Sequence, residues 1–287
     1  MTMIHILILA LVQGAAELLP VSSSAHVIVI GKLMGLDPTT PEMTLLLVML
    51  HTGTMFAVIC YFWKAWKASF FSSRQQFTDA FKLIVLATVM TGTVGLALKA
   101  LIERFVLGNV PHAEIELLFG NLGLISAALT AAGLLIITAG LRGKRGTESS
   151  EIEIKKSILI GVVQGLCLPF RGFSRSGATI SVGLLLGAAR AKAEEFSFAL
   201  AVVLTPPVIA REVLRLLKAH SLASSPQGPH LLGLFLPSMV GMALSFLAGL
   251  LALRWLSSWL ERGRWHFFGY YCLAAALFVF VCYRLGI

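Results

Sequence analysis

Long apolar runs separated by short polar segments dominate this chain of 287 residues. Six of the runs reach the length of about 20 residues that an α-helix needs to cross the hydrocarbon core of a bilayer. These six runs cover residues 44–63, 80–101, 116–141, 196–218, 231–254 and 266–285. We predict one membrane-crossing helix in each run, and therefore an all-α polytopic membrane protein.

Two further apolar regions are interrupted by short polar stretches. Residues 4–34 contain Leu-Pro-Val-Ser-Ser-Ser at 19–24, and residues 157–190 contain Pro-Phe-Arg-Gly-Phe-Ser-Arg-Ser-Gly at 169–177. Each flank has only about 10 to 15 residues, too few to cross a bilayer. We predict two re-entrant helix-loop-helix hairpins, which are tolerated at membrane depth only where protein or a cavity surrounds them.

The two interrupted regions resemble copies of each other. The tripeptide Val-Gln-Gly at 12–14 recurs at 163–165, an offset of 151 residues, and without a gap Ser23 then falls on Ser174. Broken helices at corresponding places in two halves indicate a membrane site at the interface between repeats. Each predicted repeat has one hairpin and three crossing helices. The predicted boundaries are a first inverted repeat at 1–141, a cytoplasmic linker at 142–156 and a second inverted repeat at 157–287.

The composition supports a membrane protein and narrows the classes of partner. Hydrophobic residues make up 57% of the chain and charged residues 13%, whereas soluble domains carry roughly 25% charged residues. The formal charge of +9 comes from basic residues that lie mostly in short loops. Placing loops 64–82, 142–156, 190–195 and 254–265 in the cytoplasm satisfies the tendency of basic loops to stay inside. We therefore expect the bilayer as a partner, and no nucleic acid.

Aromatic residues near the ends of the predicted helices are typical of interfacial anchors. Trp66 and Trp265 belong to this group. Trp and Tyr are enriched where a membrane meets water, because their rings combine an apolar body with a polar atom. We therefore expect these residues to anchor the chain at the interface rather than to form a binding site.

Ionisable and hydroxyl side chains gather at both interruptions. The first holds Gln13, Glu17, Ser22, Ser23, Ser24 and His26, and the second holds Arg171, Ser174, Arg175 and Ser176. Charged residues at bilayer depth are costly, which makes them candidates for a functional site. A helix that restarts after a break points N–H groups and its positive dipole end at an anion, and arginine adds a fork that matches phosphate. Two facing breaks would form an anion cradle suited to phosphoryl transfer.

Each of these residues also has a structural alternative. Glu17 and Arg175 could form an ion pair that only holds the bundle together, and His26 could be a satisfied interior histidine. Serines in membrane helices often serve packing or bond the backbone. His51, in Leu-His-Thr-Gly-Thr at 50–54, either lines the same pocket or packs within its helix.

Two runs carry a resemblance to a known family. Residues 13–26, Gln-Gly-Ala-Ala-Glu-Leu-Leu-Pro-Val-Ser-Ser-Ser-Ala-His, resemble the first signature of the undecaprenyl-diphosphate phosphatases, the bacitracin-resistance family. Residues 172–180, Gly-Phe-Ser-Arg-Ser-Gly-Ala-Thr-Ile, resemble the second signature, and the likeness covers nearly the whole chain. It implies an α-helical phosphatase of interlocked inverted repeats in the bacterial cytoplasmic membrane. Its site would open to the outer face, and its product would be the monophosphate lipid carrier for envelope polysaccharides.

The sequence departs from the family at two positions. Gln13 stands where the family usually has a glutamate, and Arg171 where it usually has a proline. The family implies a divalent cation, Mg²⁺ or Ca²⁺, with Glu17 as a ligand. Loss of the second carboxylate lowers the negative charge available to that cation. Arg171 could supply a second phosphate contact or reach a headgroup.

The resemblance implies a catalytic set of Glu17, Ser23, His26 and Arg175. In this hypothesis Arg175 clamps the diphosphate, Ser23 is the nucleophile, His26 is its proton acceptor or the acid for the leaving group, and Glu17 orients the others or binds the metal. Direct attack by water is an alternative route. The candidate substrate-binding residues are Gln13, Ser22, Ser24, His51, Arg171, Ser174 and Ser176.

Two hypotheses for the function follow from these residues. The first is hydrolysis of undecaprenyl diphosphate to undecaprenyl phosphate and phosphate. The rival is a transporter or flippase for an anionic polyprenyl lipid, because inverted repeats with broken helices are typical of transporters. A serine, a histidine and a glutamate beside an arginine favour the enzyme. Association of two copies as a homodimer is left open.

Overall fold

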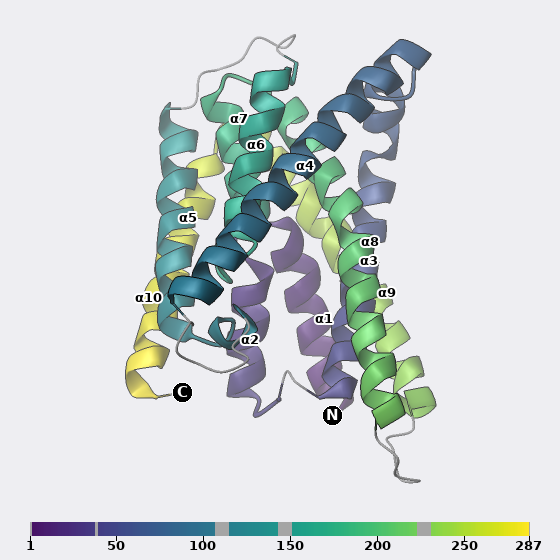
Figure 1. Ribbon diagram of the computed structural model, residues 1–287, viewed down its shortest axis with the longest axis vertical. Helices are drawn as coiled ribbons and strands as arrows, with labels where there is room; N and C mark the ends of the chain where they lie inside the picture. Colours follow the sequence, from purple (N-terminus) through teal and green to yellow (C-terminus); the bar gives the residue numbers. More distant parts are fainter. Residues whose placement is uncertain (1, 38–39, 107–114, 143–150, 223–230, 287) are drawn as a thin grey trace.

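A computed structural model describes residues 2–37, 40–106, 115–142, 151–222 and 231–286 (Figure 1). In these residues the chain forms ten α-helices and one short 3₁₀ helix, and it forms no strand. Six helices are long and apolar enough to cross a membrane, which confirms the predicted class. They are α3 (Pro41–Ser69), α4 (Arg74–Phe105), α5 (Leu122–Arg142), α8 (Arg190–Leu222), α9 (Leu231–Glu261) and α10 (Trp265–Leu285).

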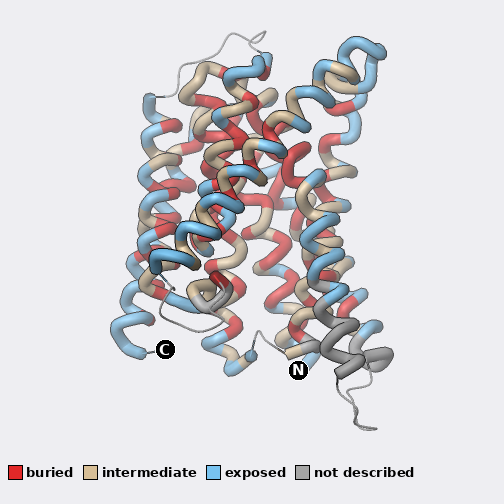
Figure 2. Tube along the Cα trace, in the orientation of Figure 1, coloured by how far each residue is buried: buried red, intermediate tan, exposed pale blue. Residues whose placement is uncertain are grey.

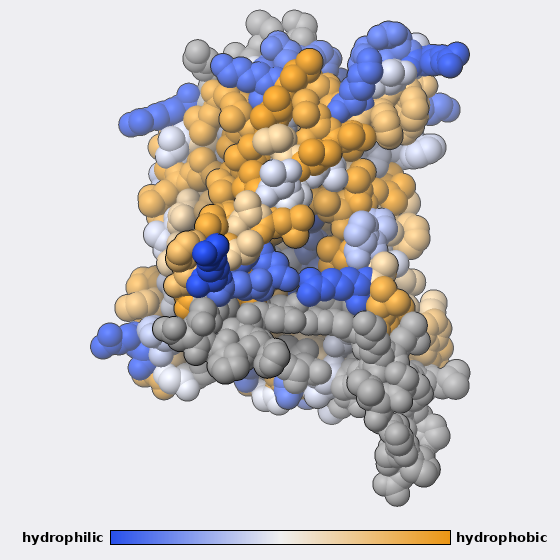
Figure 3. Space-filling view, in the orientation of Figure 1, coloured by the Kyte–Doolittle hydropathy of each residue, from blue (hydrophilic) through white to orange (hydrophobic). Residues whose placement is uncertain are grey.

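The outer surface of the bundle is apolar over much of its height. Exposed residues follow the outward faces of the long helices (Figure 2), and hydrophobic residues cover most of the middle of the visible face (Figure 3). Large hydrophobic side chains such as Leu96 and Leu277 are 70% and 66% exposed. A water-soluble protein rarely exposes such a continuous apolar surface, so this surface fits a lipid environment.

The run predicted at 116–141 differs from the observed helix. A 3₁₀ helix, η1 (Ile115–Leu118), comes first, and α5 begins only at Leu122. The reason is local, because the Asn121 side chain accepts a hydrogen bond from the Leu124 amide at 3.1 Å and so caps the helix. Of the predicted linker, residues 143–150 lie outside the described residues.

The first interruption separates two short helices, α1 (Met3–Leu18) and α2 (Ser23–Leu33). Leu19 precedes a proline and is extended, with φ −72° and ψ 151°, as a residue before proline prefers. Ser22 has a positive φ of 67°, which a residue other than glycine rarely adopts. The chain therefore turns sharply within four residues, and α2 packs back against α1.

The second interruption separates α6 (Ile154–Cys167) from α7 (Arg175–Leu185). Gly172 in this break has φ 101°, and a Cβ atom there would lie 2.6 Å from the Ile125 carbonyl oxygen. Only glycine fits at this place. Ser174 then caps α7, because its hydroxyl accepts a hydrogen bond from the Gly177 amide at 3.2 Å.

The cap at the end of each second short helix shows which residues correspond between the two interruptions. Gly35 ends α2 and Gly187 ends α7, both with a positive φ and with the same pattern of backbone hydrogen bonds. These glycines are 152 residues apart, whereas the Val-Gln-Gly tripeptides are 151 apart, so the stretch from the tripeptide to the glycine is one residue longer in the second region. Counted back from these two glycines, Ser23 lies at the place of Arg175, one position beyond the gap-free match of Ser23 to Ser174.

Each half of the chain packs its first short helix against a long helix of the other half. A Cβ atom on Gly14 of α1 would lie 2.6 Å from the Ser245 carbonyl oxygen of α9. A Cβ atom on Gly165 of α6 would lie 2.8 Å from the Thr91 carbonyl oxygen of α4. The helices α5 and α10, one from each half, also pack along each other (Figure 1). The two halves are therefore interlocked rather than side by side.

Two predicted interfacial tryptophans instead lie inside the protein. Trp265 is 1% exposed, and its ring N–H donates to the Ser181 hydroxyl at 2.9 Å. Trp66 is 7% exposed and donates to the Glu195 carbonyl oxygen at 3.1 Å. Their expected role as interfacial anchors is wrong, because packing against other helices supplies both the apolar contacts and the hydrogen-bond acceptor.

Candidate active site

Glu17, in the last turn of α1, connects the two interruptions. Its Oε1 atom accepts a hydrogen bond from Arg175 Nη2 at 2.9 Å. Its Oε2 atom accepts hydrogen bonds from the Ser23 hydroxyl at 2.5 Å and from Gln13 Nε2 at 3.0 Å. His51 Nε2 of α3 lies 3.8 Å from the same oxygen. Four residues predicted from the sequence are thus brought together around the carboxylate of a fifth.

The location of this cluster is partly enclosed. The Glu17 side chain is 15% exposed, whereas those of Arg175 and His51 are 28% and 34% exposed. Gln13 is buried beneath them. The carboxylate is therefore the most enclosed of the three groups, and Arg175 keeps a partly accessible guanidinium group for an incoming anion. His51 Nδ1 lies 2.8 Å from the Leu47 carbonyl oxygen, so the N–H of the neutral ring is already used.

His26 has a different set of partners from the one predicted. Its Nδ1 atom lies 2.8 Å from the Ser22 carbonyl oxygen, and its Nε2 atom lies 2.8 Å from the Tyr271 hydroxyl of α10. A carbonyl oxygen only accepts hydrogen bonds, so Nδ1 carries the hydrogen and Nε2 accepts from Tyr271. Ser23 instead donates its hydroxyl hydrogen to Glu17. The predicted pairing of Ser23 with His26 as its proton acceptor is therefore absent from this arrangement.

The other predicted serines hold the two breaks in shape. The Ser22 and Ser24 hydroxyl groups lie 3.2 Å apart and share a hydrogen bond. Ser176 donates its hydroxyl hydrogen to the Leu19 carbonyl oxygen at 3.4 Å, which joins the second break to the first. Ser174 uses its hydroxyl to cap α7.

Arg171 lies against an aromatic ring next to the second break. Its guanidinium carbon is 4.5 Å from the centre of the Phe119 ring, a distance typical of a cation–π interaction. Phe119 comes directly after η1, so this contact ties the segment before α5 to the break. The cation at position 171 thus has a packing role in the described structure, and its predicted contact with substrate stays a prediction.

Two helix N-termini face the cluster. Arg175 is the first residue of α7, and Ser23 is the first residue of α2. The Ser22 hydroxyl does not cap α2, so it accepts no hydrogen bond from the N–H groups of the first turn. Those N–H groups can therefore bind another acceptor. N–H groups at a helix terminus bind anions. Together with the guanidinium group, they form a site that favours a phosphate group.

The described side chains provide few ligands for a divalent cation. No group of three or more histidine, cysteine or acidic side chains in the described ranges could hold a metal ion. Glu17 is the carboxylate of the cluster, and both of its oxygens already accept hydrogen bonds. Mg²⁺ and Ca²⁺ need about six or more oxygen ligands. The side chains present do not by themselves fit such an ion.

Tyr271 is the site residue that the sequence did not reveal. It lies 245 positions after His26 in the chain, within an ordinary aromatic stretch of α10. The two rings stack with centroids 5.7 Å apart. The sequence around Tyr271 carries no motif, so only the packing of α10 against the first interruption identifies it.

Comparison with known proteins shows the family of this chain. The family model described as bacitracin resistance protein BacA matches residues 6–278. Undecaprenyl-diphosphatase 2 of Acinetobacter baylyi is 58% identical over 96% of this chain and 95% of its own length. Undecaprenyl-diphosphatases of Rhodopirellula baltica and Renibacterium salmoninarum are 32% and 31% identical, over 96% and 100% of this chain and 96% and 98% of their own lengths. The chain belongs to the bacitracin resistance protein BacA family.

Proposed function

We propose that this protein hydrolyses undecaprenyl diphosphate to undecaprenyl phosphate and inorganic phosphate, and so recycles the lipid carrier for cell-wall synthesis. The family and its relatives named undecaprenyl-diphosphatase support this function. The observation that carries it is the contact of Glu17 with both Ser23 and Arg175. One carboxylate thus orients a hydroxyl group and a phosphate-binding cation from opposite halves of the chain.

The contacts suggest how the residues divide the reaction. Arg175 and the N–H groups of α2 and α7 bind the terminal phosphate and neutralise its charge. The Ser23 oxygen attacks the terminal phosphorus while its proton passes to Glu17, the group to which it already donates. The bond from this phosphorus to the bridging oxygen breaks and releases undecaprenyl phosphate. Water then hydrolyses the phosphoserine at Ser23 and restores the hydroxyl group.

His26 and Tyr271 occupy the other side of the first break. As His26 gives its Nδ1 hydrogen to the leaving oxygen, its Nε2 atom takes the hydrogen of the Tyr271 hydroxyl, and the half-exposed phenol regains a proton from water. His26 then has the role of acid for the leaving group, and Glu17 has the role of base. His26 and Glu17 thus both take part in the reaction, in separate steps.

The proposal includes a membrane arrangement. Helices α1 and α2 lie in the lower half of Figure 1, and α6 and α7 lie in the upper half. This placement, with the exchanged packing partners of α1 and α6, supports two re-entrant hairpins in inverted repeats. Basic loops such as 64–82 and 254–265 belong to the cytoplasm in this arrangement. The site then opens to the outer face of the bacterial inner membrane.

Two expectations about partners stay predictions. A divalent cation at Glu17 would need the diphosphate oxygens to supply most of its ligands. A homodimer also stays a prediction. The activity of the purified protein with and without a chelator tests the cation. The mass of the protein in detergent tests the homodimer.

Phosphate release from undecaprenyl diphosphate by the purified protein in detergent tests the function. We expect release by the unchanged protein and a loss of at least about 10²-fold in Ser23→Ala. Ser24→Ala is the matched control, because Ser24 bonds to Ser22 rather than to Glu17. If the unchanged protein releases no phosphate, the proposed function is wrong. Equal rates in the two variants would favour direct attack by water.

The rival function, movement of an anionic polyprenyl lipid across the bilayer, fits the same interlocked halves. A binding site alone has no need for a hydroxyl group held 2.5 Å from a carboxylate, so this contact favours the enzyme. Reconstitution with undecaprenyl phosphate in one leaflet separates the two. Transfer between leaflets without phosphate release from the diphosphate would support the rival.

A further inference from the structure

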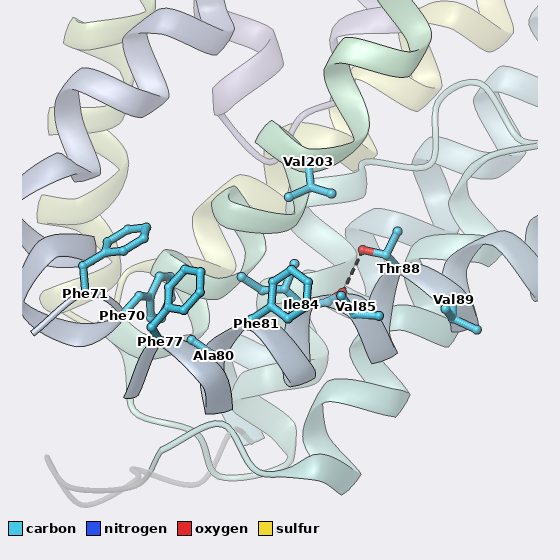
Figure 4. A pocket seen from close by; sticks show the side chains of 10 residues that line it. All are labelled: Phe70, Phe71, Phe77, Ala80, Phe81, Ile84, Val85, Thr88, Val89 and Val203. Carbon is cyan, nitrogen blue, oxygen red and sulfur yellow. Dashed lines mark hydrogen bonds between the residues drawn. The ribbon is translucent and has the colours of Figure 1, made fainter. Parts of the chain in front are cut away.

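An apolar groove lies between the end of α3, the first half of α4 and the middle of α8. Its volume is about 330 Å³, within the range of pockets that bind small ligands. Four phenylalanines line it, with Val203 of α8 facing the side chains of α4 (Figure 4). Its one polar side chain, Thr88, donates its hydroxyl hydrogen to the Ile84 carbonyl oxygen at 2.8 Å. The groove therefore offers nothing to a polar ligand.

The groove exists because two corresponding pairs of helices pack differently. In one pair α3 meets α9 closely, and a Cβ atom on Gly53 would lie 2.3 Å from the Met242 carbonyl oxygen. In the other pair α8 and α4 touch over a much shorter length. The corresponding place in α8 holds Leu204 and Thr205, and Pro206 follows inside the helix. Larger side chains and a proline replace the glycine that allows close approach, so a gap remains beside α4.

The inner end of the groove lies at about the depth of the phosphate-binding cation. The hydroxyl groups of Thr179 in α7 and Ser197 in α8 are 2.6 Å apart. These helices are joined by a short turn and run antiparallel. Arg175 lies four residues before Thr179 in α7, and Val203 lies six residues after Ser197 in α8. Because the helices are antiparallel, both residues lie on the same side of this contact, at roughly 6 and 9 Å along the helix axes. The two residues therefore differ in depth by only a few ångströms.

The outer end of the groove lies where α3 turns into α4. Phe71 and Phe77 flank this turn with ring centroids 5.7 Å apart, and Phe81 stacks on Phe77 at 6.1 Å. All three side chains are about half exposed. The groove thus runs from the depth of Arg175 towards the end of the bundle that holds the basic loop 64–82, along a face open to the bilayer.

We propose that this groove holds part of the polyprenyl chain of the diphosphate whose headgroup is bound at Arg175. The inference rests on the proposed function. Helices α1 and α2 lie in the lower half of Figure 1 and α6 and α7 in the upper half, so a headgroup bound between the two breaks lies near the middle of the bundle's height. From there the chain of the lipid runs sideways or onward along the upper half of the bundle. A wall of aromatic and branched aliphatic side chains with no unsatisfied polar group suits a methyl-branched isoprenoid.

Substrates of two chain lengths test the proposal. Val85→Trp fills the groove along α4, and it should raise the KM for undecaprenyl diphosphate by about tenfold. The KM for farnesyl diphosphate should change much less, because its shorter chain fills less of the groove. Leu277→Trp, on the exposed face of α10, is the matched control and should alter neither value. An equal change of KM for both substrates in Val85→Trp would overturn the proposal.

A photoreactive group placed a few isoprene units from the headgroup of a polyprenyl diphosphate gives a second, direct measurement. We expect it to label the peptide 70–89 and to be competed by undecaprenyl phosphate. Labelling elsewhere, or competition only by phospholipid, would show that the chain lies outside the groove. This readout needs no turnover. Failure of the unchanged protein to release phosphate would therefore overturn the proposed function and leave the groove to be judged by the labelling.

Discussion

The substitution Glu17→Gln should remove the proposed base while leaving the fold intact. The carboxylate accepts three hydrogen bonds, from Gln13, Ser23 and Arg175. A glutamine amide keeps one acceptor oxygen for Arg175 at 2.9 Å and turns its NH₂ group towards the other two partners. The Ser23 hydroxyl rotates to accept, and the Gln13 amide reverses to present its oxygen, so no polar group is stranded. The fold should therefore survive while Ser23 loses the group that takes its proton.

The expected kinetic signature follows from the same contacts. Loss of a general base costs about 10²–10⁴-fold in turnover, or about 3–5 kcal/mol. The substrate also no longer has to separate Arg175 from a carboxylate, so KM should fall or stay the same. Phosphate release over a range of substrate concentrations gives both constants. Glu195→Gln is the control, because its side chain is 12% exposed and also meets a serine and a cation, in a different part of the bundle. A kcat within about threefold of the unchanged protein, about 0.7 kcal/mol, would refute the assignment of Glu17 as base.

Three further substitutions test the remaining roles. Arg175→Lys should nearly abolish phosphate release in a folded protein, because an ammonium group cannot make the two parallel contacts of a guanidinium group. The circular dichroism spectrum checks the fold. A rate of release within about threefold of the unchanged protein would count against the role of Arg175 as a clamp. Tyr271→Phe removes the donor to His26 and should lower kcat by about tenfold and shift the pH–rate profile; an unaltered profile would show that the pair only packs. Gln13→Glu places a second carboxylate one turn from Glu17 and should strengthen the dependence on added Mg²⁺ or Ca²⁺. Identical activity curves against metal concentration, with a chelator as reference, would place position 13 outside the phosphate shell.

The architecture could be predicted because its signals are local in the sequence. Six apolar runs have the length of a membrane-crossing helix, and each became a helix. The first break follows from Pro20 and its three serines, and the second from Gly172. Both are short-range effects of allowed backbone angles. The cluster of Glu17 with Arg175 also follows, because charged side chains in an apolar bundle must find partners.

The details of chemistry could not be predicted because they depend on distant contacts. The partner of His26 is Tyr271, 245 residues away, and neither residue carries a signal for the other. The stretch from the Val-Gln-Gly tripeptide to the glycine that ends the second short helix is one residue longer in the second region, so Arg175, rather than Ser174, lies at the place of Ser23. An alignment without gaps hides this shift. One additional residue changes which side chain begins α7, while the motif itself stays the same.

The two glutamines of the repeated tripeptide show why the halves cannot share one role. Gln13 donates to Glu17 four residues later, at the centre of the site. Gln164 is fully buried and donates to the Thr91 hydroxyl of α4 at 3.1 Å, and the residue four positions after it is Leu168. The same amide therefore supports the chemistry in one half and the packing between helices in the other. With the carboxylate supplied by the first half and the guanidinium group by the second, neither half holds both an acceptor for the proton and a cation for the phosphate. The proposed reaction thus requires both halves of the chain, because one half supplies the base and the other supplies the clamp.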